Sequence, residues 1–252
     1  IWYPNRQYKA ELKVRDGFLI VVLFWTVLGT VGGIPLMLAS NPQLSVAGAM
    51  FEAFSGLTTT GATVLTGIEF LPKAILYYRQ QLQWLGGMGI IVLAVTILPM
   101  LGVGGMQLYR AETPGPVKDN KMTPRIADTA KHLWYIYLAL TLSCMLAFYL
   151  AGMNWFDAIC HAFSTVAIGG FSTYDASIGH FQSPLINAIC VIFLLLSAVN
   201  FPLHFAAIRG KSVSTYFRDP EFKAFLTIQA ALVLICFVVL LETNVYNTPA
   251  EA

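Results

Sequence analysis

The sequence has few charged residues and no large excess of either sign. Of its 252 residues, 11% are charged and 57% are hydrophobic, whereas a soluble domain usually carries about 25% charged residues. The net charge is only +2, and no basic run with interleaved aromatic residues is present, so we expect no nucleic-acid partner. The composition excludes an ordinary soluble domain and predicts a membrane protein that contacts the lipid bilayer.

Motifs of common enzymes and metal sites are also missing. The patterns GxSxG, GxGxxG, GxxxxGK[ST] and HExxH do not occur, and the four cysteines form no CxxC pair. We therefore expect neither an enzyme nor a zinc site or disulfide framework. The cysteines are interpreted as small buried hydrophobic residues.

Long apolar stretches dominate what is present. A helix needs about 20 residues to cross a bilayer, and five stretches are long enough: about 17–38, 80–108, 133–152, 184–208 and 224–241. Two shorter apolar segments, 46–58 and 155–166, lie between successive spans and are predicted to be re-entrant helices. Pro202 predicts a kink or break near the inner end of the fourth span. The predicted fold class is therefore an all-α membrane protein with about five spanning helices and two re-entrant pore helices.

Lysine and arginine are distributed unevenly among the connecting segments. Thirteen lie before the first span and in the loops 110–131 and 209–223, whereas the intervening loops hold only Lys73 and Arg79. The positive-inside rule then places the N-terminus and both basic loops in the cytoplasm. With this orientation, the short segments enter the membrane from its outer face.

One structural unit is predicted to occur twice. Each unit has a spanning helix, a short helix, a glycine-bearing loop and a second spanning helix, and Ala53-Phe54-Ser55 aligns with Ala162-Phe163-Ser164. We expect a first unit at 1–110, a second at 111–210 and the beginning of a third at 211–252. The chain also begins at Ile1 rather than at methionine, and we interpret it as a fragment of a longer protein.

The loops after the short helices carry the expected chemistry. Segments 57–63 and 166–173 contain no charged residue, and they place Gly61, Gly169 and Gly170 where the chain must turn. Non-helical backbone at membrane depth survives only in contact with protein or a wet cavity. Rows of carbonyls there can replace the water shell of a monovalent cation. A TTTG stretch alone also fits an ordinary helix cap, but its place in a repeated unit favours the cation site.

Four segments together resemble a known family. They are Phe54–Thr63 (FSGLTTTGAT), Gln83–Ile90 (QWLGGMGI), the loop residues Glu112–Pro116 with Pro124-Arg125-Ile126, and Phe163–Ser172 (FSTVAIGGFS). This combination resembles the Trk/Ktr/HKT superfamily of potassium transporters, and within it the bacterial Trk-type uptake subunit. The likeness covers nearly the whole chain.

The resemblance implies a function and a site. In that superfamily four such units surround one pore, and one glycine per unit marks the selectivity filter, which here implies Gly61 and Gly170. The transported ion is potassium, and the residues implied to contact it, mainly through backbone carbonyls, are Thr59, Thr60, Gly61, Ile168, Gly169 and Gly170.

The resemblance also implies partners and a location. These are the remaining units of the same subunit, a homodimer, a cytoplasmic nucleotide-binding regulatory ring, and the bacterial inner membrane. Two alternatives are a cation channel built from two-unit subunits and a membrane anchor that transports nothing. The channel predicts that two copies of this chain suffice for conduction, and the anchor predicts that changes in the two loops leave ion uptake untouched.

Several other residues have two possible roles. Glu52 and His161 occupy matching positions in the short helices, and we favour hydrogen bonds that pin helix to loop over a direct functional role. Asp175 and Glu69 either concentrate cations at the outer mouth or are ordinary solvated residues. The glycines of Gly29–Gly33 and Gly86–Gly89 favour close helix packing over a gating hinge.

Overall fold

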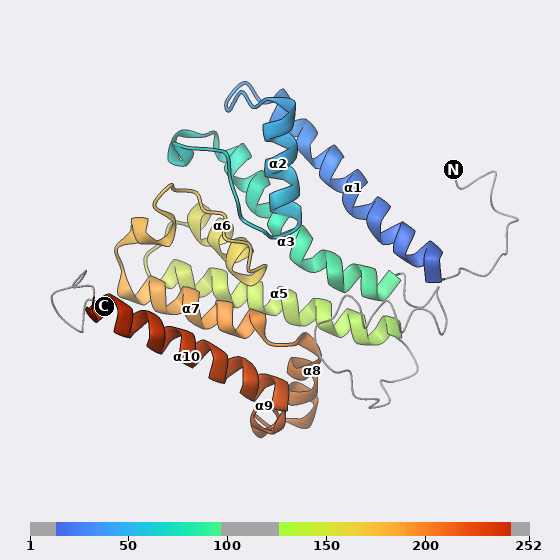
Figure 1. Cartoon of the computed structure of the whole chain (residues 1–252), viewed down its shortest axis with the longest axis vertical. Coiled ribbons are helices and arrows are strands. Elements are labelled where there is room, and N and C mark those ends of the chain that lie inside the picture. The colour runs from blue at the N-terminus through green and yellow to red at the C-terminus, as the bar shows by residue number, and fades with distance from the viewer. Residues whose placement is uncertain (1–13, 97–125, 243–252) are drawn as a thin grey trace, which may run out of the picture. The chain divides into compact units, whose positions relative to one another are not determined.

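The computed structural model describes residues 14–96 and 126–242, and over these ranges it contains helices and no strand (Figure 1). The all-α class is therefore confirmed for the described part. The elements are α1 (Val14–Leu38), α2 (Val46–Leu57), the 3₁₀ helix η1 (Ile68–Phe70), α3 (Lys73–Thr96), α5 (Ile126–Leu150), α6 (Trp155–Val166), the 3₁₀ helix η3 (Ser177–Phe181), α7 (Pro184–Ala198), α8 (Phe201–Gly210), α9 (Ser214–Arg218) and α10 (Pro220–Glu242).

Several of these helices are suited to a membrane. Among the described residues, three are long and apolar enough to cross it, at Val21–Leu38, Lys131–Leu150 and Pro220–Glu242. Helices α7 and α8 add a fourth span if they form one broken crossing. The end of the second predicted span and the motifs at 112–116 and 124–125 lie outside the described residues.

The second and fourth predicted spans differ from the helices observed. Helix α3 begins at Lys73, before the predicted start near Gln80. Arg79 therefore lies within a helix, and our placement of it in an outer loop was wrong. The break predicted near Pro202 is confirmed, because α7 ends at Ala198 and Pro202 lies in the first turn of α8. Proline is tolerated there since it has no backbone N–H to donate.

The chain divides into two compact units, Ile1–Ala198 and Val199–Ala252. In the second, His204 Nδ1 and the Tyr216 hydroxyl are hydrogen-bonded at 2.8 Å, which joins α8 to α9. Helix α10 has no buried residue in the described structure, although it is apolar along its length. Its surface suits lipid or protein contact better than water.

In the first unit, α1 and α2 pack through glycines. The position of a Cβ atom on Gly29 overlaps the Phe54 ring, and a Cβ on Gly33 meets the Met50 sulfur at 3.0 Å. The Tyr78 hydroxyl of α3 donates a 2.8 Å hydrogen bond to the Gly32 carbonyl and ties α3 to the same helix. Close packing, the favoured role for these small residues, is thus what the structure shows.

Helix α3 lies against the C-terminal ends of both short helices. A Cβ on Gly86 overlaps the Leu57 carbonyl oxygen of α2, and a Cβ on Gly87 lies 3.1 Å from the Ala167 Cα atom just after α6. Helix α5 holds α3 from another side, because the Tyr137 hydroxyl donates to the Trp84 carbonyl at 3.0 Å. The two adjacent glycines therefore place the ends of α2 and α6 on one central helix.

Substituting Gly86 by alanine tests this packing. The new methyl group has to displace the backbone of Leu57, so we expect Gly86→Ala to lower the free energy of unfolding by about 1–3 kcal/mol. Gly179→Ala is the matched control, because a Cβ there has no atom within 4 Å. The measurement is the melting temperature of the full-length protein in detergent. Equal melting temperatures for the two variants contradict the packing role.

Candidate functional site

The two short helices begin and end alike. Ser45 caps α2 by accepting from the Gly48 amide, and Asn154 caps α6 by accepting from the Asp157 amide. Both helices have the same length and form where the sequence predicts them. The repeat seen in the sequence is thus also a repeat of local structure.

The loops that follow also share one backbone path. Thr59 and Ile168 both adopt a φ of 54°, and the glycines two residues later, Gly61 and Gly170, adopt φ values of 76° and 85°. In each loop, an amide turns back to a serine carbonyl in the last turns of the short helix, from Thr60 to Ser55 at 2.9 Å and from Gly169 to Ser164 at 2.8 Å. The path is thus left-handed at two positions in each loop, and the second of them is occupied by glycine, which adopts a positive φ without steric cost.

The two loops meet backbone to backbone at their glycines. The position of a Cβ on Gly61 overlaps the Gly169 carbonyl oxygen, and a Cβ on Gly170 lies 3.8 Å from the Gly61 Cα. Residues far apart in the sequence are thereby brought together at the ends of α2 and α6. Of the six predicted site residues, Gly61, Gly169 and Gly170 meet across this junction, and Thr59, Thr60 and Ile168 directly precede them in the two loops.

The chemical groups at this junction are oxygens without a net charge. Thr60 of the first loop is exposed, as are Ile168 and Gly170 of the second loop, whereas Gly169 is buried. In the described residues, no cluster of three His, Cys, Asp or Glu side chains can hold a metal ion. What the junction offers a cation is backbone carbonyls together with the Thr58 and Thr60 hydroxyls, which lie 2.8 Å apart.

A buried ion pair supports the first loop. Arg79 Nε donates to Glu52 at 2.7 Å, and both side chains are fully buried. The same carboxylate accepts from the Thr63 hydroxyl at 2.9 Å and from the Val64 amide at 3.2 Å. The guanidinium continues to the second loop, where it donates to the Ser172 carbonyl at 3.3 Å. Because Glu52 neutralises the charge of Arg79, the pair supports both loops without placing a net charge next to them.

The second loop has an equivalent support of different chemistry. Because a carbonyl only accepts, the 2.8 Å contact between His161 Nδ1 and the Asp157 carbonyl requires that Nδ1 donates. His161 Nε2 then contacts the Ser172 hydroxyl at 3.0 Å. Ser172 is the counterpart of Thr63 in the repeat, so Glu52 and His161 both pin a short helix to its loop, as we favoured from the sequence.

Asp157 anchors the C-terminal end of the second loop. One oxygen accepts from the Thr173 hydroxyl and the other from the Tyr174 hydroxyl, both at 2.8 Å. Burial, the hydrogen bond to Asp157 and nearby carboxylates raise the pKa of Tyr174 to about 12, so the phenol remains protonated as a donor.

The segments that follow the two glycine-bearing loops are also hydrogen-bonded to each other. Asp175 accepts from the amides of Gly67 at 2.7 Å and Ile68 at 3.1 Å. Glu69 in turn accepts from the Asp175 amide at 3.2 Å. The two carboxylates are exposed but bonded to backbone, which differs from the purely solvated role considered above.

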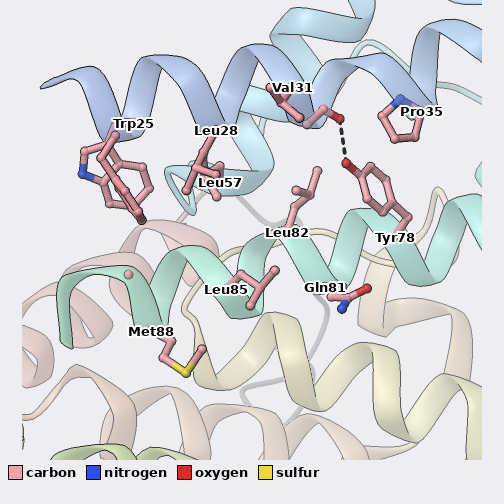
Figure 2. A pocket seen from close by; sticks show the side chains of 13 residues that line it. Trp25, Leu28, Val31, Pro35, Leu57, Tyr78, Gln81, Leu82, Leu85 and Met88 are labelled. Carbon is pink, nitrogen blue, oxygen red and sulfur yellow. Dashed lines mark hydrogen bonds between the residues drawn. The ribbon is translucent and has the colours of Figure 1, made fainter. Parts of the chain in front are cut away.

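An apolar cavity lies beside this site, between α1 and α3. It has a volume of about 440 Å³, and Figure 2 shows Trp25, Leu28 and Val31 of α1 facing Leu82 and Leu85 of α3. The Tyr78 hydroxyl at its edge is already bonded to Gly32. The lining therefore lacks the row of free oxygens that a cation requires.

Comparison with known proteins identifies the family. The model of the TrkH family, described as a cation transport protein, matches residues 1–248. The chain belongs to the TrkH family. This is a family of transporters rather than enzymes, so the expectation of no enzymatic activity and the resemblance drawn from the sequence are both confirmed.

Two proteins of the TrkH family are similar to this chain over nearly its whole length. The Trk system potassium uptake protein TrkH of Vibrio parahaemolyticus is 66% identical over 253 residues, which cover 100% of this chain and 52% of that protein. The protein of the same name from Escherichia coli K12 is 64% identical over 248 residues, covering 98% of this chain and 51% of that protein.

A solved structure of a TrkH family member has the same fold. The crystal structure of the potassium transporter TrkH from Vibrio parahaemolyticus superposes with a TM-score of 0.84 at 60% identity, covering 99% of this chain and 50% of that one. The chain thus spans about half the length of the curated relatives it matches. Together with the apolar helices, the family identifies a membrane protein.

Two supporting residues, Arg79 and Gln83, were not assigned a role from the sequence. Both lie on α3 and are fully buried. The available signal was a charged and an amide side chain within an otherwise apolar helical segment, where such groups are rare unless paired or functional. Their partners in the second loop, Ser172 and Gly169, lie 93 and 86 residues away in the chain, so only the fold reveals them.

The buried pair is testable by a double-mutant cycle. Removing one partner leaves an uncompensated buried charge, so we expect Arg79→Met or Glu52→Leu alone to cost about 3–5 kcal/mol of stability. The double variant should cost less than the sum of the two, because no lone charge remains. Unfolding of the full-length protein in detergent measures all four corners. Additive losses would show that the two side chains act separately.

Proposed function

We propose that the full-length protein carries potassium across the bacterial cytoplasmic membrane through a carbonyl-lined filter. The observation that carries this proposal is the meeting of two glycine-bearing loops, backbone to backbone, at the C-terminal ends of two short helices. Membership of the TrkH family and relatives named as potassium uptake proteins support it. Potassium is here the transported substrate.

The proposed site consists of backbone oxygens on Thr59, Thr60, Gly61, Ile168, Gly169 and Gly170. Helices α2 and α6 re-enter the membrane from its outer face and direct their partly negative C-terminal ends toward the ion. The loop carbonyls replace the water that a potassium ion loses on entry. The supports at Glu52, Arg79 and His161 hold those carbonyls in place.

Four repeated units surround the proposed pore. This chain supplies the first at 1–110, the second at 111–210 and the beginning of a third at 211–252. The relatives are about twice as long as the chain, which leaves room for two further loops to complete the ring. The N-terminus is cytoplasmic, in keeping with the lysine and arginine distribution.

The proposed assembly extends beyond one subunit. We infer a homodimer of full-length subunits and a cytoplasmic nucleotide-binding regulatory ring as partners, both from family resemblance. Of the two alternatives, a channel of two-unit subunits predicts that two copies of this chain conduct, and a membrane anchor predicts that changes in the loops leave ion uptake untouched.

Substitution of the filter glycines tests the function. A side chain on Gly61 or Gly170 occupies the junction and strains a positive φ. We therefore expect Gly61→Ser and Gly170→Ser, in the full-length gene, to raise the potassium concentration needed for growth by about tenfold or more. The host is a bacterial strain without its own potassium uptake systems.

Gly152→Ser is the matched control for backbone strain. Gly152 has a φ of 106° and open space around it, away from both loops. We expect this variant to support growth at wild-type potassium concentrations when expression is equal. If the two loop variants also grow like the wild type, the loops do not select ions and the anchor interpretation replaces the proposal.

A further inference from the structure

The second loop receives hydrogen bonds from one glutamine on both sides of its glycine. Gln83 is fully buried on α3. Its Nε2 donates to the Gly169 carbonyl at 2.7 Å, and its Oε1 accepts from the Phe171 amide at 3.2 Å. The side chain thus bonds the residues before and after Gly170 and leaves Gly170 itself exposed.

This arrangement reproduces what a neighbouring strand does for an extended chain. An amide side chain has one donor and one acceptor side, as a peptide group has, and it satisfies backbone groups that no sheet partner reaches. Unpaired backbone groups at membrane depth cost several kcal/mol each. Gln83 therefore fixes both the position and the orientation of the peptides that flank Gly170.

The Gln83 side chain also packs tightly against the backbone of the second loop. A Cβ on Gly169 overlaps the Gln83 side-chain amide, with its nitrogen only 2.7 Å away. One turn earlier on α3, Arg79 bonds the Ser172 carbonyl and lies over the Phe171 ring at 4.3 Å. A single helix of the first repeat thus contacts Gly169, Phe171 and Ser172 of the second loop.

Gln80 shows that a buried glutamine on this helix need not be bonded. It is also fully buried, yet among the described residues neither its Nε2 nor its Oε1 has a hydrogen-bond partner. Gln80 and Gln83 are thus the same side chain, on the same helix, with the same burial and opposite bonding. This pair provides a matched experiment.

We propose that Gln83 is a positioning residue for ion selectivity, which keeps the second loop at the width that suits potassium. The inference rests on the proposed function. A loop clamped on both sides of Gly170 resists closing around the smaller sodium ion, whereas a released loop accepts both ions. Gln83 contacts the backbone of the filter and not the ion.

The test compares uptake of potassium and sodium by the full-length protein in liposomes. Gln83→Met removes both hydrogen bonds at similar size, and we expect the ratio of potassium to sodium uptake to fall about tenfold, the scale set by two lost buried bonds. Gln83→Glu keeps the acceptor for the Phe171 amide but places a second acceptor against the Gly169 carbonyl, so the ratio should fall here as well. Gln80→Met should retain the wild-type ratio.

Each outcome decides the matter. A folded Gln83→Met protein with wild-type selectivity overturns the proposal, as does an equal loss in Gln80→Met, which indicates helix packing alone. If Gln83→Met does not fold, Gln83→Glu decides by the same criterion. Gly170→Ser is measured in parallel: if it leaves the uptake ratio unchanged, the filter function itself fails, independently of the result at Gln83.

Discussion

Backbone that leaves a helix inside a membrane must find hydrogen-bond partners within the protein, because lipid provides none. In the proposed pore, the two glycine-bearing loops meet this constraint with side chains from several helices. The Ser55 carbonyl accepts from the Thr60 amide and its hydroxyl donates to the Ala62 carbonyl, so both groups bond the first loop. Glu52, His161, Arg79 and Gln83 supply the remaining contacts. Helix α3 can supply such contacts because its glycines, Gly86 and Gly87, let it pack closely against the ends of the two short helices.

Features set by local sequence were predictable. The short helices follow from brief apolar segments with Ser45 and Asn154 as caps, and the glycine pair at 86–87 indicated close packing. The supports of the loops were not predictable in the same way. From the sequence, Arg79 resembled a loop residue, because a cation within a span is costly unless it is paired, and the sequence shows no partner for it. That partner, Glu52, lies on another helix, and its pairing depends on how the helices pack.

The two repeats share a backbone path but differ in the groups that stabilise it. A carboxylate with an arginine holds the first loop, whereas an imidazole and a serine hydroxyl hold the second. Different chemistry can therefore serve one geometry, which explains why the repeat is weak in sequence and clear in structure. The hydrogen bond between Asp175 and the Gly67 amide then links the two copies directly.

The dependence of the second loop on α3 has a consequence for biogenesis. Helix α3 precedes that loop in the chain, so during synthesis from the N-terminus the groups that receive it are made first. Helix α7 follows the loop and contains neither arginine nor glutamine. For the second loop, the order of translation thus coincides with the order of dependence, because the side chains that bond it have already been made when it is synthesised.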